Sequence, residues 1–213
     1  QVFIGDYIGV SSGGSRVVAI GAGIAENNTG SDVYAIGSWD TIDNNSGNNL
    51  IALGNDTGRF NSGDNTILIG DYAGESNTGD FNISIGNTAG GFTQGQFNVA
   101  LGINAGLDND GDFNIILGRQ AGYNNDGDHN FFADDQTAYL LDATNTVAIG
   151  QQAMRGNSGA QAVNNIALGY HAGYSIDTGS NNNIIIGYSA ADGIGAGAER
   201  NIIIGDDIDI PNA

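Results

Sequence analysis

The chain repeats one plan with a period of about 16 residues. Residues 69–84 read IGDYAGESNTGDFNIS, and the next two blocks read IGNTAGGFTQGQFNVA and LGINAGLDNDGDFNII. The glycine of each Ile-Gly or Leu-Gly pair marks the repeat from Gly5 to Gly205, and Asp134 stands where one glycine is expected. A fixed period of this size is typical of a solenoid, in which each repeat forms one rung and covers its neighbour's apolar surface. We therefore predict an all-β solenoid of about 13 rungs.

The spacing of the marker glycines divides the chain into three stretches. Regular rungs of about 16 residues, one of them a single residue longer, fill residues 1–128. A degenerate rung covers residues 129–145, and longer rungs of 18 or 19 residues occupy 150–213. Because one repeating plan runs through all three stretches, we predict a single β-solenoid repeat domain over residues 1–213.

Each rung is predicted to contain one short strand just before its glycine. The positions one and three residues before the glycine are apolar, as in Ile83 and Ile85, and strand alternation places them on one face. The middle position between them is also apolar in every rung except at Ser84. A strand that is apolar on both faces is buried on both faces. We therefore predict that the outer pair fills the coil and that the middle position faces another copy of the chain. The middle-position residues assigned to this partner face include Ala19, Ala35, Ala52, Leu68, Ala100, Ile116, Ala148, Ala167, Ile185 and Ile203.

The turns of the rung also follow a pattern. An alanine three residues after the glycine, as in Ala73, is predicted to be a second inward contact, and the glycine after it, as in Gly74, to have positive φ. An asparagine recurs four residues before the marker glycine, and its amide either stacks with its neighbours as a ladder or closes the turn at the strand entrance. These asparagines are Asn82, Asn98, Asn114, Asn130, Asn165, Asn183 and Asn201.

The charge balance excludes several partners. The formal net charge is -19, with only five basic residues among 213. Nucleic-acid binding requires clustered Lys and Arg, so we expect none. Apolar runs stay below the ~18 residues of a membrane span, so we expect no membrane insertion. The start at Gln1, without methionine, suggests a processed or excised piece.

Three segments interrupt the repeat: residues 38–49, 129–145 and 154–165. Departures from a solenoid repeat map to loops that project from one face, often the binding face. The alternative is a tolerated bulge without a binding role. The candidate receptor-facing residues in these segments are Trp39, Phe131 and Tyr139.

Neither catalytic nor metal-binding residues form a firm constellation. His129 and His171 lie in or beside turns without a distinctive Ser or Asp motif, so we expect no enzymatic activity and no cofactor. Calcium is the one candidate ion, because aspartates alternate around glycine turns in LDNDGDFN and NNDGDHN. The closing bidentate Glu of a calcium loop is missing, and a plain turn is the alternative. The candidate calcium ligands are Asp108, Asp110, Asp112, Asp126 and Asp128.

The repeat unit N-(I/V)-(A/S)-(I/L)-G-x-x-A, followed by a loop with N-T-G, resembles the head repeats of trimeric autotransporter adhesins. It is similar above all to the related repeats of phage and prophage tail fibres, which often precede an endosialidase-type self-cleaving chaperone. The final stretch, NIIIGDDIDIPNA, looks like the segment upstream of such a chaperone. The resemblance implies a left-handed parallel β-roll that forms a parallel homotrimer, with the middle-position column at the trimer axis.

A second resemblance concerns left-handed β-helix acyltransferases. IGDYAG, IGNTAG, LGINAG and LGRQAG each fit their hexapeptide pattern. That fold needs the pattern three times per coil, whereas here it occurs only once in each repeat, which argues against the acyltransferase interpretation.

The expected function is structural and adhesive. We expect an extracellular segment of a phage tail fibre or cell-surface adhesin, acting as a stiff spacer that presents loops to a surface glycan or protein receptor. The first alternative is a subunit of a bacterial extracellular filament. Less favoured alternatives are the acyltransferase and a polysaccharide depolymerase, which would use paired carboxylates on a solenoid.

Overall fold

The computed structural model describes residues 1–208, and this part of the chain contains strands and turns but no helix. It forms about 13 turns of a β-solenoid, and equivalent residues of adjacent turns recur at the predicted spacing, which confirms the architecture. Contacts divide the chain into two compact units, unit 1 (Gln1–Asp108) and unit 2 (Asn109–Ala213). The predicted segment NIIIGDDIDIPNA lies partly outside the described residues.

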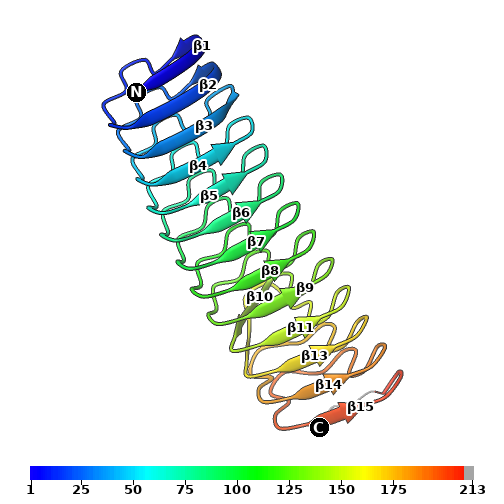
Figure 1. Ribbon diagram of the computed structural model, residues 1–213. Helices are drawn as coiled ribbons and strands as arrows, with labels where there is room; N and C mark the ends of the chain where they lie inside the picture. Colours follow the sequence, from blue (N-terminus) through cyan, green and yellow to red (C-terminus); the bar gives the residue numbers. More distant parts are fainter. Residues whose placement is uncertain (209–213) are drawn as a thin grey trace. The chain divides into compact units, whose positions relative to one another are not determined.

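Unit 1 contains seven strands that pair in parallel and in chain order (Figure 1). The register advances by one repeat from strand to strand, so that Gly5 lies opposite Gly21 and Ile83 opposite Val99. Each connection between strands is one circuit of the coil. The strands are β1 (Val2–Ile8), β2 (Val17–Ile24), β3 (Val33–Ser38), β4 (Leu50–Leu53), β5 (Ile67–Ile69), β6 (Ile83–Ile85) and β7 (Val99–Leu101).

Unit 2 continues the same plan and adds a second, two-stranded sheet. Its main sheet has the order β8-β9-β11-β13-β14-β15, and β10 pairs in parallel with β12 in the separate sheet. β9 is the strand predicted for the degenerate rung, whereas β10 and β12 form in parts of the segments 129–145 and 154–165 that the sequence predicts as projecting loops. The strands are β8 (Ile115–Leu117), β9 (Phe131–Ala133), β10 (Leu141–Thr144), β11 (Val147–Ile149), β12 (Ala160–Val163), β13 (Ile166–Leu168), β14 (Ile184–Ile186) and β15 (Ile202–Ile204).

The middle position of each strand points into the coil, which corrects the predicted faces. The assignment of this column to an exposed partner face or trimer axis is wrong, because its side chains fill the interior of a single chain. Their exposed fractions are 7% or less at Ala19, Ala35, Ala52, Leu68, Ala100, Ile116, Ala148, Ala167, Ile185 and Ile203.

The narrow width of the coil explains why the middle position of each strand, and not the outer pair, points inward. The predicted second inward contact is confirmed, since Ala73 is fully buried. The interior therefore holds one middle-position side chain facing one small residue, with no room for two large side chains per strand. A Cβ added to Gly74 would lie 2.4 Å from Cδ2 of Leu68, so this glycine makes room for a large middle-position residue. Gly74 also has the predicted positive φ of 62°.

At Asn82, the asparagine before the strand closes its own turn and also bonds to the backbone of the next rung. The Asn82 side chain donates to the carbonyl of Gly79 in its own rung at 3.2 Å, which closes the turn. It also donates to the Gly95 carbonyl at 2.8 Å and accepts from the backbone N–H of Asn98 at 2.8 Å. Asn82 is 1% exposed, so these bonds between rungs lie inside the protein.

A second buried asparagine ladder was not predicted from the sequence. Nδ2 of Asn45 donates to Oδ1 of Asn28, Nδ2 of Asn61 to Oδ1 of Asn45, and Nδ2 of Asn77 to Oδ1 of Asn61, at 2.7–2.9 Å. Each of these side chains is 1% exposed or less. All four lie in N-x-G segments, which by themselves predict only a turn.

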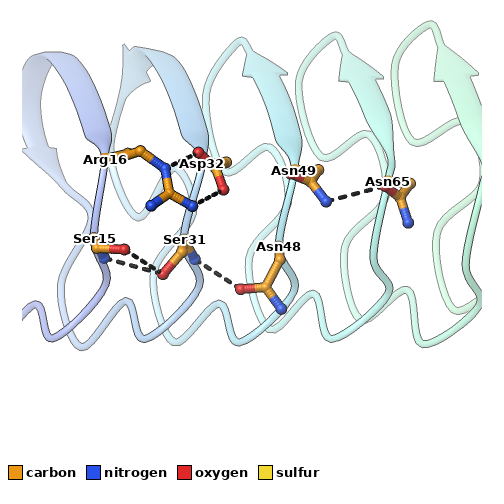
Figure 2. Close-up of polar contacts among 7 residues, drawn as sticks. All are labelled: Ser15, Arg16, Ser31, Asp32, Asn48, Asn49 and Asn65. Carbon is orange, nitrogen blue, oxygen red and sulfur yellow. Dashed lines mark hydrogen bonds and ion pairs between the residues drawn. The ribbon is translucent and has the colours of Figure 1, made fainter.

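Polar side chains also form ladders on the outside of unit 1 (Figure 2). Arg16 forms an ion pair with Asp32, and Asn49 donates to Asn65 at 3.0 Å. These residues occupy one position of four successive rungs, five residues before the marker glycine. A side chain on this solenoid is therefore flanked by the equivalent residues of the adjacent rungs.

Candidate interaction surfaces

The outer face of the main sheet carries an apolar surface. The positions one and three residues before the marker glycine, predicted to lie inside, alternate outward instead and are half-buried or exposed. Monomeric proteins rarely expose large contiguous apolar patches, so such a face marks an interaction surface. The exposed members are Val2, Ile4, Tyr34, Ile36, Ile51, Ile85 and Leu101 in unit 1, and Ile115, Ile149, Ile166, Ile202 and Ile204 in unit 2.

Aromatic residues extend this face toward the start of the strands. In unit 1, Phe81 and Phe97 stack with ring centroids 4.8 Å apart and an interplanar angle of 3°. In unit 2, Phe113 and His129 stack at 5.0 Å. All four lie five residues before a marker position and are exposed, so the outward alternation of the strand continues through them.

A cavity of about 470 Å³ lies in unit 1, on the edge that follows the strands. Trp39 and Asp40 follow β3. Asn55 and Asp56 follow the glycine after β4, and Asp71 and Tyr72 follow the glycine after β5. Trp39, Asp56 and Tyr72 each lie two residues after a marker glycine and so form one column over three rungs. The cavity is lined by Trp39, Asp40, Asn55, Asp56, Asp71 and Tyr72.

Backbone hydrogen bonds fix this column. The N–H of Asp56 donates to the carbonyl of Trp39, and the N–H of Tyr72 donates to the carbonyl of Asn55, both at 2.9 Å. Beside the column, Oγ of Ser38 donates to Oδ1 of Asn55 at 2.6 Å. The cavity wall is therefore built on the same bonds between rungs that hold the solenoid together.

The cavity is acidic. Arg59 is the cation beside it, with Nε 3.7 Å from Oδ2 of Asp40, against three lining carboxylates. Oδ1 of Asp71 accepts from the backbone N–H of Asn55 at 3.2 Å. Desolvation by burial, and then the charge of Asp40, raises the pKa of Asp56. The cavity therefore offers hydrogen-bond acceptors and repels anions.

The structure separates the three residues predicted to face a receptor. Trp39 lies just after β3 and is 74% exposed, consistent with its predicted place on an exposed surface. Phe131 is not in a loop but in β9, where it is half-buried. Tyr139 lies in a turn, also half-buried, and stacks on Tyr123 with Arg155 5.3 Å from its ring centroid.

The aspartates proposed as calcium ligands take part in the stacking of rungs. Oδ1 of Asp128 accepts from the backbone N–H of Asp112 at 2.8 Å, and the N–H of Asp126 donates to Asp142 at 3.3 Å. Over residues 1–208, no group of three or more His, Cys, Asp or Glu side chains is arranged to hold a metal ion. Calcium binding by the turn aspartates, including Asp108 and Asp110, stays a prediction.

The two histidines are held by aromatic and amide neighbours. His129 stacks on Phe113, whereas His171 stacks on Tyr170 at 3.9 Å and lies 2.6 Å from Gln152 through Nε2. The nearest carboxylate to His171 belongs to Asp192, at 4.0 Å. These contacts tie each ring to adjacent side chains of the stack.

Two searches complete the description. In residues 1–208, no helix has the length and apolar character needed to cross a membrane. No protein-family model, curated protein or solved structure shows significant similarity to the chain. The function is therefore inferred from the residues of this chain alone.

Proposed function

We propose that the chain is a structural and adhesive segment of an extracellular trimeric fibre, such as a phage tail fibre or a cell-surface adhesin. In this proposal the chain is a left-handed β-roll whose parallel homotrimer forms a stiff spacer and presents side-edge residues to a surface receptor. The observation that carries it is the apolar outer face of the main sheet, which a single chain leaves uncovered.

The trimer contact moves to a different set of residues from the one first expected. The interior column is already buried within one chain and contributes nothing to a contact between chains. The outer columns, represented by Ile85 and Leu101, recur at every rung and are apolar and accessible. Covering them against the same columns of two other copies would remove this surface from water without any other partner.

The mass of the protein in solution tests this proposal. One chain weighs 21.8 kDa, so a trimer weighs three times as much, about 65 kDa. We expect the larger mass for the native protein, measured by light scattering after size-exclusion chromatography. A stable, soluble monomer would overturn the proposal.

Paired variants locate the contact. Ile85→Asp places three like charges in the covered face of a trimer, so we expect dissociation to folded monomers. Thr78→Asp adds the same charge at an exposed turn position and leaves the mass unchanged. Dissociation by both variants, or by neither, would show that the outer face is not the contact. Open-ended polymers in electron micrographs would instead favour the filament-subunit alternative.

A further inference from the structure

The cavity lined by Trp39 has two exposed aromatic walls that the packing of the solenoid does not require. Its aromatic walls, Trp39 and Tyr72, are 74% and 43% exposed, so they do not serve the interior packing. Their backbone is left-handed, with φ of 50° and 58°, as it is throughout this column of the repeat. The fold requires the backbone conformation but not an aromatic side chain, since Thr88 and Asn104 occupy the same position in the next two rungs.

The spacing of the two aromatic residues suits a flat ring. Trp39 and Tyr72 lie two rungs apart, which corresponds to roughly 10 Å of stacked strand spacing. A ring in van der Waals contact with an aromatic face on each side needs about 7–8 Å between those faces. Asp56 occupies the rung between the two aromatic residues, so a ring held between them would lie outward of the Asp56 side chain.

The polar lining selects the edge chemistry of that ring. The carboxylates of Asp40, Asp56 and Asp71 only accept hydrogen bonds when ionised, and Oδ1 of Asn55 already acts as an acceptor. A ligand must therefore supply several donors and carry no negative charge. A pyranose ring satisfies both conditions, because its C–H faces pack on aromatic rings and its edge carries hydroxyl donors.

We propose that the cavity is a binding subsite for a non-acidic sugar residue, held between Trp39 and Tyr72 with its hydroxyl groups directed to Asp56 and the neighbouring carboxylates. The proposal deepens the adhesive function stated above, because it names the receptor class as a neutral glycan. Sugars with carboxylate or sulfate groups are repelled by the three aspartates. Asp56 lies between the aromatic residues in the column and already accepts a hydrogen bond from the Tyr72 side chain, so a sugar hydroxyl would bind to the remaining acceptor sites of this carboxylate.

The chain supplies its own reporter for this site. Trp39 is the only tryptophan among the 213 residues, so intrinsic tryptophan fluorescence reports on the cavity wall alone. The experiment titrates the native protein with neutral tetrasaccharides of glucose, galactose, mannose and N-acetylglucosamine. Tri-galacturonic acid and choline serve as acidic and cationic probes. Concentrations extend to about 10 mM, the weak end of specific binding.

We expect a saturable change in Trp39 emission with at least one neutral sugar and none with galacturonic acid. Tyr72→Ala should weaken that affinity about tenfold or more, since it removes one wall of the subsite. Tyr7→Ala is the matched control, because Tyr7 is 82% exposed in the same unit but does not line the cavity. It should leave the affinity unchanged.

Three results would overturn the proposal. The first is no saturable response to any neutral sugar, and the second is an affinity that Tyr72→Ala leaves unchanged. The third is saturation by choline but not by any sugar, which would make the cavity a site for organic cations. The solution mass is measured on the same samples. A trimer without sugar binding refutes the subsite alone, and a sugar-binding monomer refutes the trimer alone.

Discussion

Asp43 provides a sharp test of how a charge is tolerated inside this solenoid. It lies in the 17-residue rung, is 4% exposed, and its Oδ1 accepts from the backbone N–H of Glu26 at 2.7 Å. The pKa of Asp43 is raised to about 6, chiefly by burial and also by the charges of Asp40 and Glu26, although the bond from the Glu26 N–H lowers it. The unfolded chain holds this carboxyl near its ordinary value of 3.8.

The sign of the effect follows from proton binding. Between pH 3.8 and about 6, the folded protein holds a proton on Asp43 that the unfolded chain has lost. The contribution of Asp43 to stability is therefore greatest at low pH and falls as the pH rises through this window. Relative to a side chain that does not titrate, the carboxyl of Asp43 lowers the free energy of unfolding by about 1.6 kcal/mol at about pH 5 and by about 3 kcal/mol at about pH 7.5.

The perturbation is Asp43→Asn, which keeps an oxygen for the Glu26 N–H and removes the titration. We expect the variant to be more stable than the native protein by about 1.6 kcal/mol near pH 5 and by about 3 kcal/mol near pH 7.5. The measurement is urea unfolding followed by far-ultraviolet circular dichroism at both pH values. All other titrating groups are common to the two proteins, so their contributions cancel in the difference.

Asp43→Ser separates titration from hydrogen bonding. Serine also removes the carboxyl but does not reach the Glu26 N–H, so this variant should lie about 1 kcal/mol below Asp43→Asn at both pH values. The change of the difference with pH should be the same for both variants. A stability difference between Asp43→Asn and the native protein that does not grow from pH 5 to pH 7.5 would refute the reasoning.

Three further perturbations test other parts of the solenoid. Asn61→Ala interrupts the buried ladder and should cost about 2–4 kcal/mol in urea unfolding, because it leaves buried polar groups without partners, whereas Asn65→Ala, on the outside, should cost less than about 0.5 kcal/mol. Asp134→Gly should raise stability by about 1 kcal/mol, because a φ of 103° is strained for any residue with a Cβ; no gain in melting temperature would contradict this. The fluorescence of Trp39 should be quenched more strongly by caesium than by iodide, because its neighbours in the cavity are carboxylates, and stronger quenching by iodide would refute the acidic character of the cavity.

The architecture could be predicted from the sequence because it depends on spacing alone. The marker glycines fix the rungs, and Gly21 shows why they cannot vary: its φ is 150°, and a Cβ there would lie 1.7 Å from the carbonyl oxygen of Gly37. The same spacing placed each strand of the main sheet, including β9 in a rung that has lost its glycine, but not β10 and β12. A position set by the close approach of backbones leaves a clear signal in the sequence.

The faces of the strand could not be predicted from the pattern. Apolar residues at Ile83, Ile85 and the middle positions are compatible with either orientation, since alternation defines two faces without naming the inner one. The size of the middle residue distinguishes the two orientations of the strand. Alanine recurs there because the coil has room for one side chain facing Ala73 or its equivalents. The two larger neighbours must then lie outside.

The cavity is not evident from any single segment of the sequence, because its lining residues come from three different rungs. Trp39 was singled out as part of an irregular stretch, while Asp56 and Tyr72 lay in rungs that look regular. Aligned on their glycines, the three occupy one position in successive rungs. Column by column, an aromatic-carboxylate-aromatic series stands out from Thr88 and the polar residues that follow it.

The inward and outward columns of the solenoid differ in how strongly their side chains are constrained. Inward columns are constrained by the width of the coil, and turn glycines by the approach of adjacent rungs, so neither can vary without a cost to stability. Outward columns, such as the one that contains Trp39 and Tyr72, carry no such constraint and tolerate any side chain that accepts the backbone conformation. Binding specificity can therefore change on this fold by substitution along a single outward column, without an inserted loop. An exposed aromatic pair that lines a cavity is consequently a stronger indication of a binding site than an irregular segment such as 129–145, which the structure absorbs into its strands.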